Sequence, residues 1–162
     1  MRLLQNISLA VLAAVMAMPA QAVSPKNDNL LCAAYMDVML EDMTPLGLIP
    51  TDKFKFMFVN RRVQLASLTL ADKELPKDVV SAFVAARDKV REDQSAAVGM
   101  NDMRLFTPSQ VDTYAINLAN NGKAHCVKAN KHLEGLMKTY TTEDFAGAVE
   151  IISNEMKAQD EN

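Results

Sequence analysis

The chain has 162 residues, of which 49% are hydrophobic and 23% charged, and its 20 acidic residues outnumber its 17 basic ones. The net charge of −3 argues against a nucleic-acid or anionic-membrane partner, since either would require clustered Lys and Arg. The length suits one domain with a sizeable core. Five glycines and six prolines are few for a β-protein with many turns, which favours helices.

The first 22 residues have the three-part layout of a secretory signal. Arg2 gives a positive start, residues 7–16 form an uncharged apolar stretch, and residues 20–22 are the small-x-small motif Ala-Gln-Ala. A membrane anchor would need about 20 uninterrupted apolar residues, which polar residues and a proline prevent here. We expect a cleavable signal peptide at 1–22 and a single helical domain at 23–162, periplasmic or secreted, with no membrane insertion after cleavage.

Two cysteines, Cys32 and Cys126, are the only ones in the chain. Export would place them where disulfides persist, so we predict that they pair. Free thiols and a metal site are the alternatives. The bridge would tie the first helix of the exported part to a late one, and closing so long a loop is worth roughly 4–5 kcal/mol in the chain-entropy model.

Two helices are predicted in the first part of the exported chain. The first is capped by Asp28 and ends near Met43, and the prolines and glycine of loop 44–50 prevent its continuation. Thr51 is then expected to cap the second helix. Its apolar residues form two stripes, Phe54, Phe58, Leu65 and Leu68 on one and Phe56, Val59, Val63, Ala66 and Leu70 on the other. Two stripes predict a helix buried on two sides.

A third helix is expected from Pro76, which suits a first helical turn, to about Val98, where Gly99 stops it. After a loop at 99–107, the sequence Thr-Pro-Ser-Gln at 107–110 is a capping box with proline at the first helical position.

The strongest turn signal in the exported part is Asn-Asn-Gly at 120–122. We interpret it as a turn between two antiparallel helices, 108–120 and 123–139; one glycine-kinked helix is the alternative. A last helix begins at residues 141–144. The predicted fold is therefore all-α, an antiparallel bundle of five or six helices stapled by one disulfide.

Methionine is in excess and suggests one kind of ligand. Met36, Met39 and Met43 follow helical spacing, and Met100 and Met103 form a Met-x-x-Met in a loop. Thioether sulfurs select Cu(I), so these five are candidate metal ligands. Such a stripe is more often core packing, because Met is a common filler of irregular gaps.

Other signs of a metal site, a cofactor or catalysis are weak. His125 and His132 lie seven residues apart on one helical face, a spacing that is not diagnostic of metal and that we interpret as surface placement. The sequence has no Gly-x-Ser-x-Gly, no Gly-rich phosphate loop and no His-Glu-x-x-His. We expect no enzymatic activity and no cofactor.

Basic residues on the second and third helices have two interpretations. Arg61 and Arg62, and Arg87, Lys89 and Arg91, could hold an anion or an acidic partner. We favour the alternative that they form salt bridges with carboxylates of adjacent helices.

By elimination, the sequence favours a protein that acts by binding another protein, as an inhibitor or immunity protein, an accessory factor or a chaperone. Loops 44–50 and 99–107 carry apolar residues that are candidates for the contact surface. These residues are Leu46, Leu48, Ile49, Leu105 and Phe106. They could equally fold back and cap the bundle. The second hypothesis is a carrier of a small ligand or of copper that uses the methionines.

Overall fold

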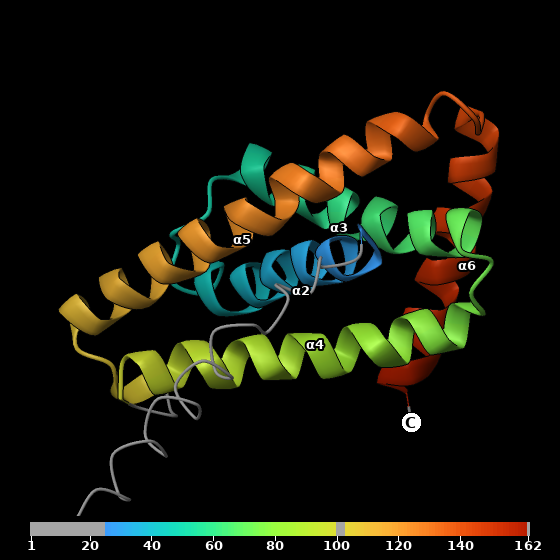
Figure 1. Ribbon diagram of the computed structural model, residues 1–162. Coiled ribbons are helices and arrows are strands. Elements are labelled where there is room, and N and C mark those ends of the chain that lie inside the picture. The colour runs from blue at the N-terminus through green and yellow to red at the C-terminus, as the bar shows by residue number, and fades with distance from the viewer. Residues whose placement is uncertain (1–24, 100–102, 162) are drawn as a thin grey trace, which may run out of the picture.

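The computed structural model describes residues 25–99 and 103–161, and it is all-helical across them (Figure 1). The helices are α2 (Pro25–Met43), α3 (Thr51–Ala71), α4 (Pro76–Ala97), α5 (Pro108–Leu136) and α6 (Thr142–Asp160), with a 3-10 turn, η1 (Met103–Leu105). This confirms the predicted all-α bundle. The expected signal peptide at 1–22 lies outside the described residues. No described helix is long and apolar enough to cross a membrane.

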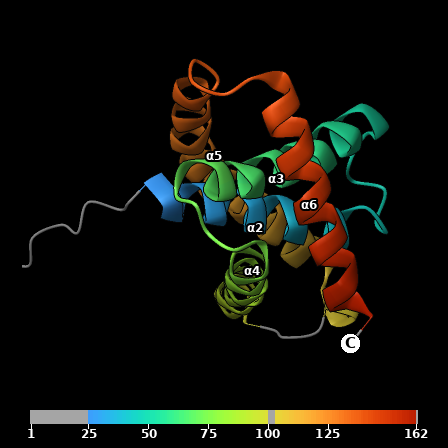
Figure 2. The same cartoon turned by 90° about the vertical axis from the view of Figure 1, so that its right-hand side faces the viewer.

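Helix α2 lies at the centre of the bundle. It packs against α3, α4 and α5, while α6 packs against α3 and α4. The chain reverses direction from α2 to α3, α4 and α5 in turn, and α6 lies across this group at a steep angle (Figures 1 and 2). A central helix must present apolar residues on several sides, and α2 accordingly buries Cys32, Ala34, Met36 and Val38.

The core consists of three clusters around α2. The largest joins α3, α4 and α6 through side chains such as Leu65, Phe83 and Ile152. The second joins α2, α4 and α5, and Tyr114 and Leu118 belong to it. The third surrounds the cysteines. Full burial of one such large apolar side chain is worth roughly 1.5–3 kcal/mol, so these contacts hold the helices together.

The predicted turn at 120–122 is wrong, because α5 continues unbroken from Pro108 to Leu136. Gly122 is buried inside this helix, and a Cβ atom there would lie 3.0 Å from the Cβ of Tyr35 on α2. The asparagines at 120 and 121 are exposed. The glycine therefore allows α5 and α2 to approach each other closely. The Asn-Asn-Gly sequence is part of the helix and does not form a turn.

Helix ends agree with the sequence where a local motif defines them. Thr107 and Thr141 each form a complete capping box, with Gln110 and Asp144 respectively. Pro76 begins α4. Two other predicted caps are wrong: Asp28 lies inside α2 rather than before it, and α3 has Pro50, not Thr51, at its N-cap.

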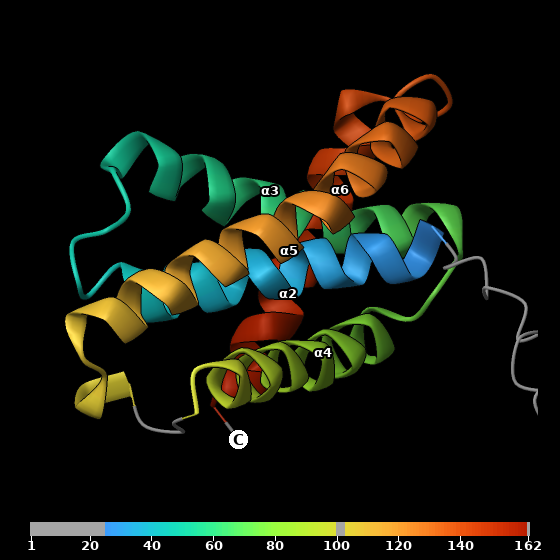
Figure 3. The ribbon, with the colours of Figure 1, turned by 60° about the vertical axis from the view of Figure 1, so that its left-hand side comes forward.

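Helix α3 is buried on two sides only in its second half. Residues 64–68 are buried, whereas Phe56 and Val59 are 60% and 56% exposed, so the prediction is wrong for the first half. That half extends away from the neighbouring helices (Figure 3). Its remaining aromatic side chains stack on each other instead, with the rings of Phe54 and Phe58 5.9 Å apart.

Candidate functional site

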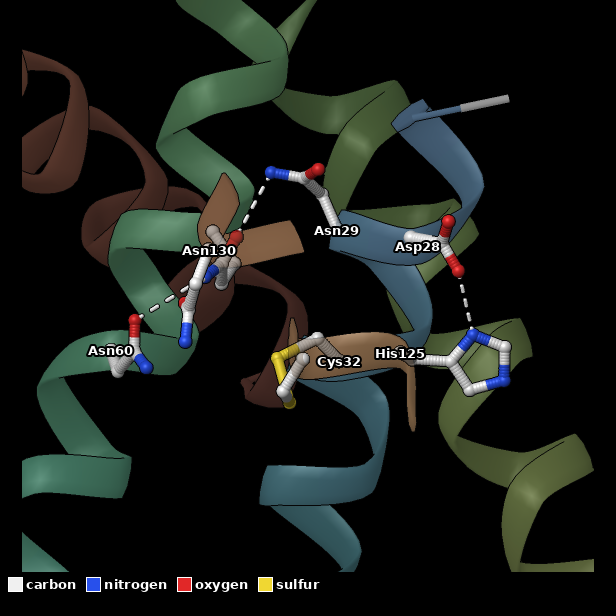
Figure 4. The surroundings of a disulfide bond; sticks show 8 residues. Asp28, Asn29, Cys32, Asn60, His125 and Asn130 are labelled. Carbon is white, nitrogen blue, oxygen red and sulfur yellow. Dashed lines mark hydrogen bonds and ion pairs between the residues drawn. A yellow bond between two sulfur atoms is a disulfide. The ribbon is translucent and has the colours of Figure 1, made fainter. Parts of the chain in front are cut away.

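The predicted disulfide is present. Cys32 of α2 and Cys126 of α5 are joined across 94 residues of sequence, with their Cα atoms 4.7 Å apart (Figure 4). Cys32 is fully buried, and Met36 and Ala129 pack beside it. The bridge therefore fixes the central helix to α5 from inside the core.

A buried polar network adjoins the disulfide. The amide of Asn29, on α2, donates to Gln64 Oε1 at 2.9 Å and to Ser67 Oγ at 2.7 Å on α3. Its carbonyl oxygen lies 3.1 Å from Nδ1 of His132 on α5. Gln64 donates in turn to Asn130 Oδ1 at 2.7 Å. The network links three helices, and buried polar groups bonded in this way specify how helices align as well as holding them.

His125 pairs with an acidic residue of α2. Its Nδ1 lies 2.8 Å from Oδ1 of Asp28, and its ring stacks on Tyr35 with 5.8 Å between centroids. This pair lies on one side of the disulfide, and Asn60 and Asn130 on the other (Figure 4). His125 and His132 therefore each contact a polar residue of α2 through Nδ1. Within the described residues, no group of three His, Cys, Asp or Glu side chains could hold a metal ion.

Charged residues of α2 and α4 form a second polar row. Arg91 contacts Glu41 at 2.6 Å and Asp42 at 3.1 Å, and the hydroxyl of Tyr114 donates to Asp42 at 2.7 Å. Burial and the bond to Asp42 raise the pKa of Tyr114 above its ordinary value. Lys89 pairs with Asp93 at 2.7 Å. These contacts confirm the salt-bridge interpretation for Arg91, whose partners lie on the adjacent helix α2, whereas Lys89 pairs within α4 itself.

The two neighbouring arginines of α3, Arg61 and Arg62, lie in different environments. Arg61 forms a buried ion pair with Asp37, whereas Arg62 pairs with no described carboxylate and lies over the Phe58 ring, 3.7 Å from its centroid. Burial and the nearby guanidinium of Arg62 lower the pKa of Arg61 to about 10. Lys53 and Lys55, which lie about two turns or slightly more before Arg62 on α3, are exposed and also pair with no described carboxylate.

The methionines of α2, for which the structure describes the side chains, do not gather at one point. Met36 packs beside the disulfide, whereas Met39 and Met43 belong to the cluster that contains Tyr114. Met100 lies outside the described residues, and Met103 begins η1. Since the methionines of α2 fill separate core clusters, their placement gives no support to a copper carrier.

The two candidate contact loops each have an inner and an outer part. Ile49 and Phe106 fold back onto the same core cluster, and the Phe106 ring meets Tyr114 edge-on at 5.6 Å. Leu46 and Leu48 are each 49% exposed, and Leu105 is 65% exposed. The fold-back interpretation therefore holds for Ile49 and Phe106, whereas Leu46, Leu48 and Leu105 remain candidates for a contact surface.

The exposed members of these loops lie at the same end of the bundle. Loop 44–50 and η1 flank the first turns of α5 (Figures 1 and 3). The exposed half of α3 follows loop 44–50 directly. We call these three segments the apolar end and define it by the five exposed apolar side chains that they carry, namely Leu46, Leu48, Phe56, Val59 and Leu105. The apolar stripes of the sequence predicted that Phe56 and Val59 are buried. Helical periodicity shows which residues share a face, but it does not show which turns of a helix pack against a neighbouring helix.

Comparison with known proteins finds no protein family, no curated protein and no solved structure that matches the chain.

Proposed function

We propose that the chain is an exported protein that acts by binding another protein at the apolar end. One observation carries the proposal: of the ten large apolar side chains that the described residues leave exposed, five belong to this end. Scattered apolar side chains are ordinary on a protein surface, but a group of them at one end is typical of an interaction site.

Export is proposed from the signal-like sequence at 1–22 and is supported by the disulfide. A disulfide that persists belongs to an oxidising compartment, which for this chain would be the periplasm or the exterior of the cell. Mass spectrometry of the protein from its native cells tests this directly. A mature chain that begins at Val23 is expected, and an intact N-terminus would contradict export.

The charge around the apolar end indicates what its partner presents. Lys53, Lys55 and Arg62 each lie within about one helical turn of Phe56 or Val59 on α3 and have no described carboxylate as a partner. Asp52 is the one acidic residue at the same spacing from Phe56, so basic residues predominate here although the chain as a whole is acidic. Complementary charge mainly accelerates association and selects partners. We therefore expect a partner whose apolar contact is bordered by Asp or Glu, and an association rate that falls as salt is added.

Photo-cross-linking in native cells tests the surface. A benzoylphenylalanine at position 48 or 56 is expected to trap one discrete protein, whereas the same probe at Ile151, which is 54% exposed on α6, should not. Leu48→Asp should abolish the adduct at position 56, and Val127→Asp, a comparable change on α5, should leave it. Equal adducts at all three probe positions, or none at positions 48 and 56, would contradict the proposal.

A further inference from the structure

A small pocket lies between α2, α3, α4 and α6. Its volume is about 130 Å³. Five charged side chains from all four helices reach it, namely Asp37, Glu41, Arg61, Arg87 and Asp160. A second hollow of about 440 Å³ is lined by α4 alone, and one helix cannot enclose a ligand. The four-helix pocket is therefore the better candidate for a binding site.

Two of the five charged side chains in this pocket are buried. Asp37 is 1% and Arg61 9% exposed, and the two form an ion pair. Removing such a pair from water costs about as much as its mutual attraction returns, so stability alone gives little reason for its presence. Burial holds the pKa of Arg61 at about 10, and strongly perturbed groups that line a pocket are typical of functional sites.

Arg87 has hydrogen-bonding capacity left over. Asp88 holds its Nε and Nη2, each at 3.0 Å. The remaining nitrogen, Nη1, lies 3.9 Å from Asp37 and 3.8 Å from Glu41, which is too far for a hydrogen bond. At these distances Nη1 forms ion pairs without hydrogen bonds, so its N–H groups can donate to an acceptor that reaches them from the pocket.

The other wall of the pocket is apolar. Val80, Phe83 and Val84 of α4 and Met156 of α6 contribute to it. Since a water molecule in the liquid takes about 30 Å³, the pocket has room for a small compound only. A ligand that satisfies all of these surroundings carries a negative group, a positive group and a short apolar part.

We propose that this pocket binds a free amino acid with a short apolar side chain. Its carboxylate accepts from Arg87 Nη1, and its ammonium group donates to Glu41 and Asp160 at the pocket rim. Its side chain contacts Val84 and Met156. The site is separate from the apolar end, so it does not depend on the proposed protein partner.

Titration calorimetry of the oxidised, signal-free protein tests the proposal with L-valine and two compounds that each lack one charge. Isovalerate is valine without the ammonium group, and isobutylamine is valine without the carboxylate. Valine is expected to bind one site in a saturable way, and each of the other two at least about tenfold more weakly, since each leaves charged groups of the pocket unpaired.

Two variants and one control complete the experiment. Arg87→Gln should weaken valine binding about tenfold or more, and Val84→Trp should fill the pocket and abolish binding. Arg91→Gln also removes an arginine bound to Glu41, but Arg91 does not line the pocket, so binding should persist. Circular dichroism confirms that each variant is folded. Absence of valine binding, equal binding of isovalerate or isobutylamine, or full binding by folded Val84→Trp would overturn the proposal.

Discussion

Gly122→Ala tests whether close helix packing explains the glycine in the middle of α5. Alanine is a better helix former than glycine by roughly 0.5–1 kcal/mol in a helix interior. At position 122 the added methyl group would meet Tyr35 Cβ at 3.0 Å and Cγ at 3.3 Å. Overpacking of this kind costs about 1–3 kcal/mol, so the loss outweighs the gain. We expect Gly122→Ala to destabilise the protein by up to about 2 kcal/mol.

Gly147→Ala on α6 is the matched control, because a Cβ atom there meets nothing within 4 Å. It should stabilise the protein by about 0.5–1 kcal/mol. Urea unfolding followed by circular dichroism measures both changes, and the midpoints should move in opposite directions with little change of slope. If Gly122→Ala stabilises as much as Gly147→Ala, Tyr35 can move aside and close packing does not explain Gly122.

Three further predictions concern the covalent bridge, the buried ion pair and the buried phenol. The variant with Cys32→Ala and Cys126→Ala should lose about 4–5 kcal/mol in urea unfolding if the chain-entropy model applies. A loss under about 1 kcal/mol would indicate that the unfolded chain is little constrained by the bridge. Asp37→Leu should cost about 3–5 kcal/mol by leaving Arg61 buried without its partner, and adding Arg61→Met should recover most of it in a double-mutant cycle; no recovery would contradict this account. Because the pKa of Tyr114 is raised in the folded protein, its contribution to stability is complete below the unfolded pKa of about 10 and is lost as the pH rises toward the folded pKa. Tyr114→Phe should therefore flatten the fall in stability above about pH 10, and an unchanged fall would exclude Tyr114 as its cause.

The sequence predicted those parts of the fold that depend on neighbouring residues. Thr107 and Thr141 cap their helices through partners three positions away, and a motif of that length is visible in the sequence. Asn-Asn-Gly at 120–122 is equally local, yet the prediction from it failed. A glycine that permits close contact and a glycine that permits a turn look the same until the partner, here Tyr35, is known.

The polar contacts of the core could not be predicted, because their partners are far apart in sequence. Asp28 and His125 are separated by 97 residues, and Asn29 and His132 by 103. Each side chain alone resembles an ordinary surface residue of an amphipathic helix.

The polar residues of α2 together contact all three helices that pack against it. Asn29 bonds to α3 and α5, Asp37 pairs with Arg61 on α3, and Asp42 accepts from α5 and pairs with α4. A central helix held by apolar contacts alone could rotate or slide, whereas each of these bonds is satisfied in one alignment only. Arg87 of α4 differs from these residues, since its Nη1 forms ion pairs with two α2 carboxylates at 3.8 and 3.9 Å but no hydrogen bond. If the proposed amino acid binds, its carboxylate would supply the acceptor that Nη1 lacks.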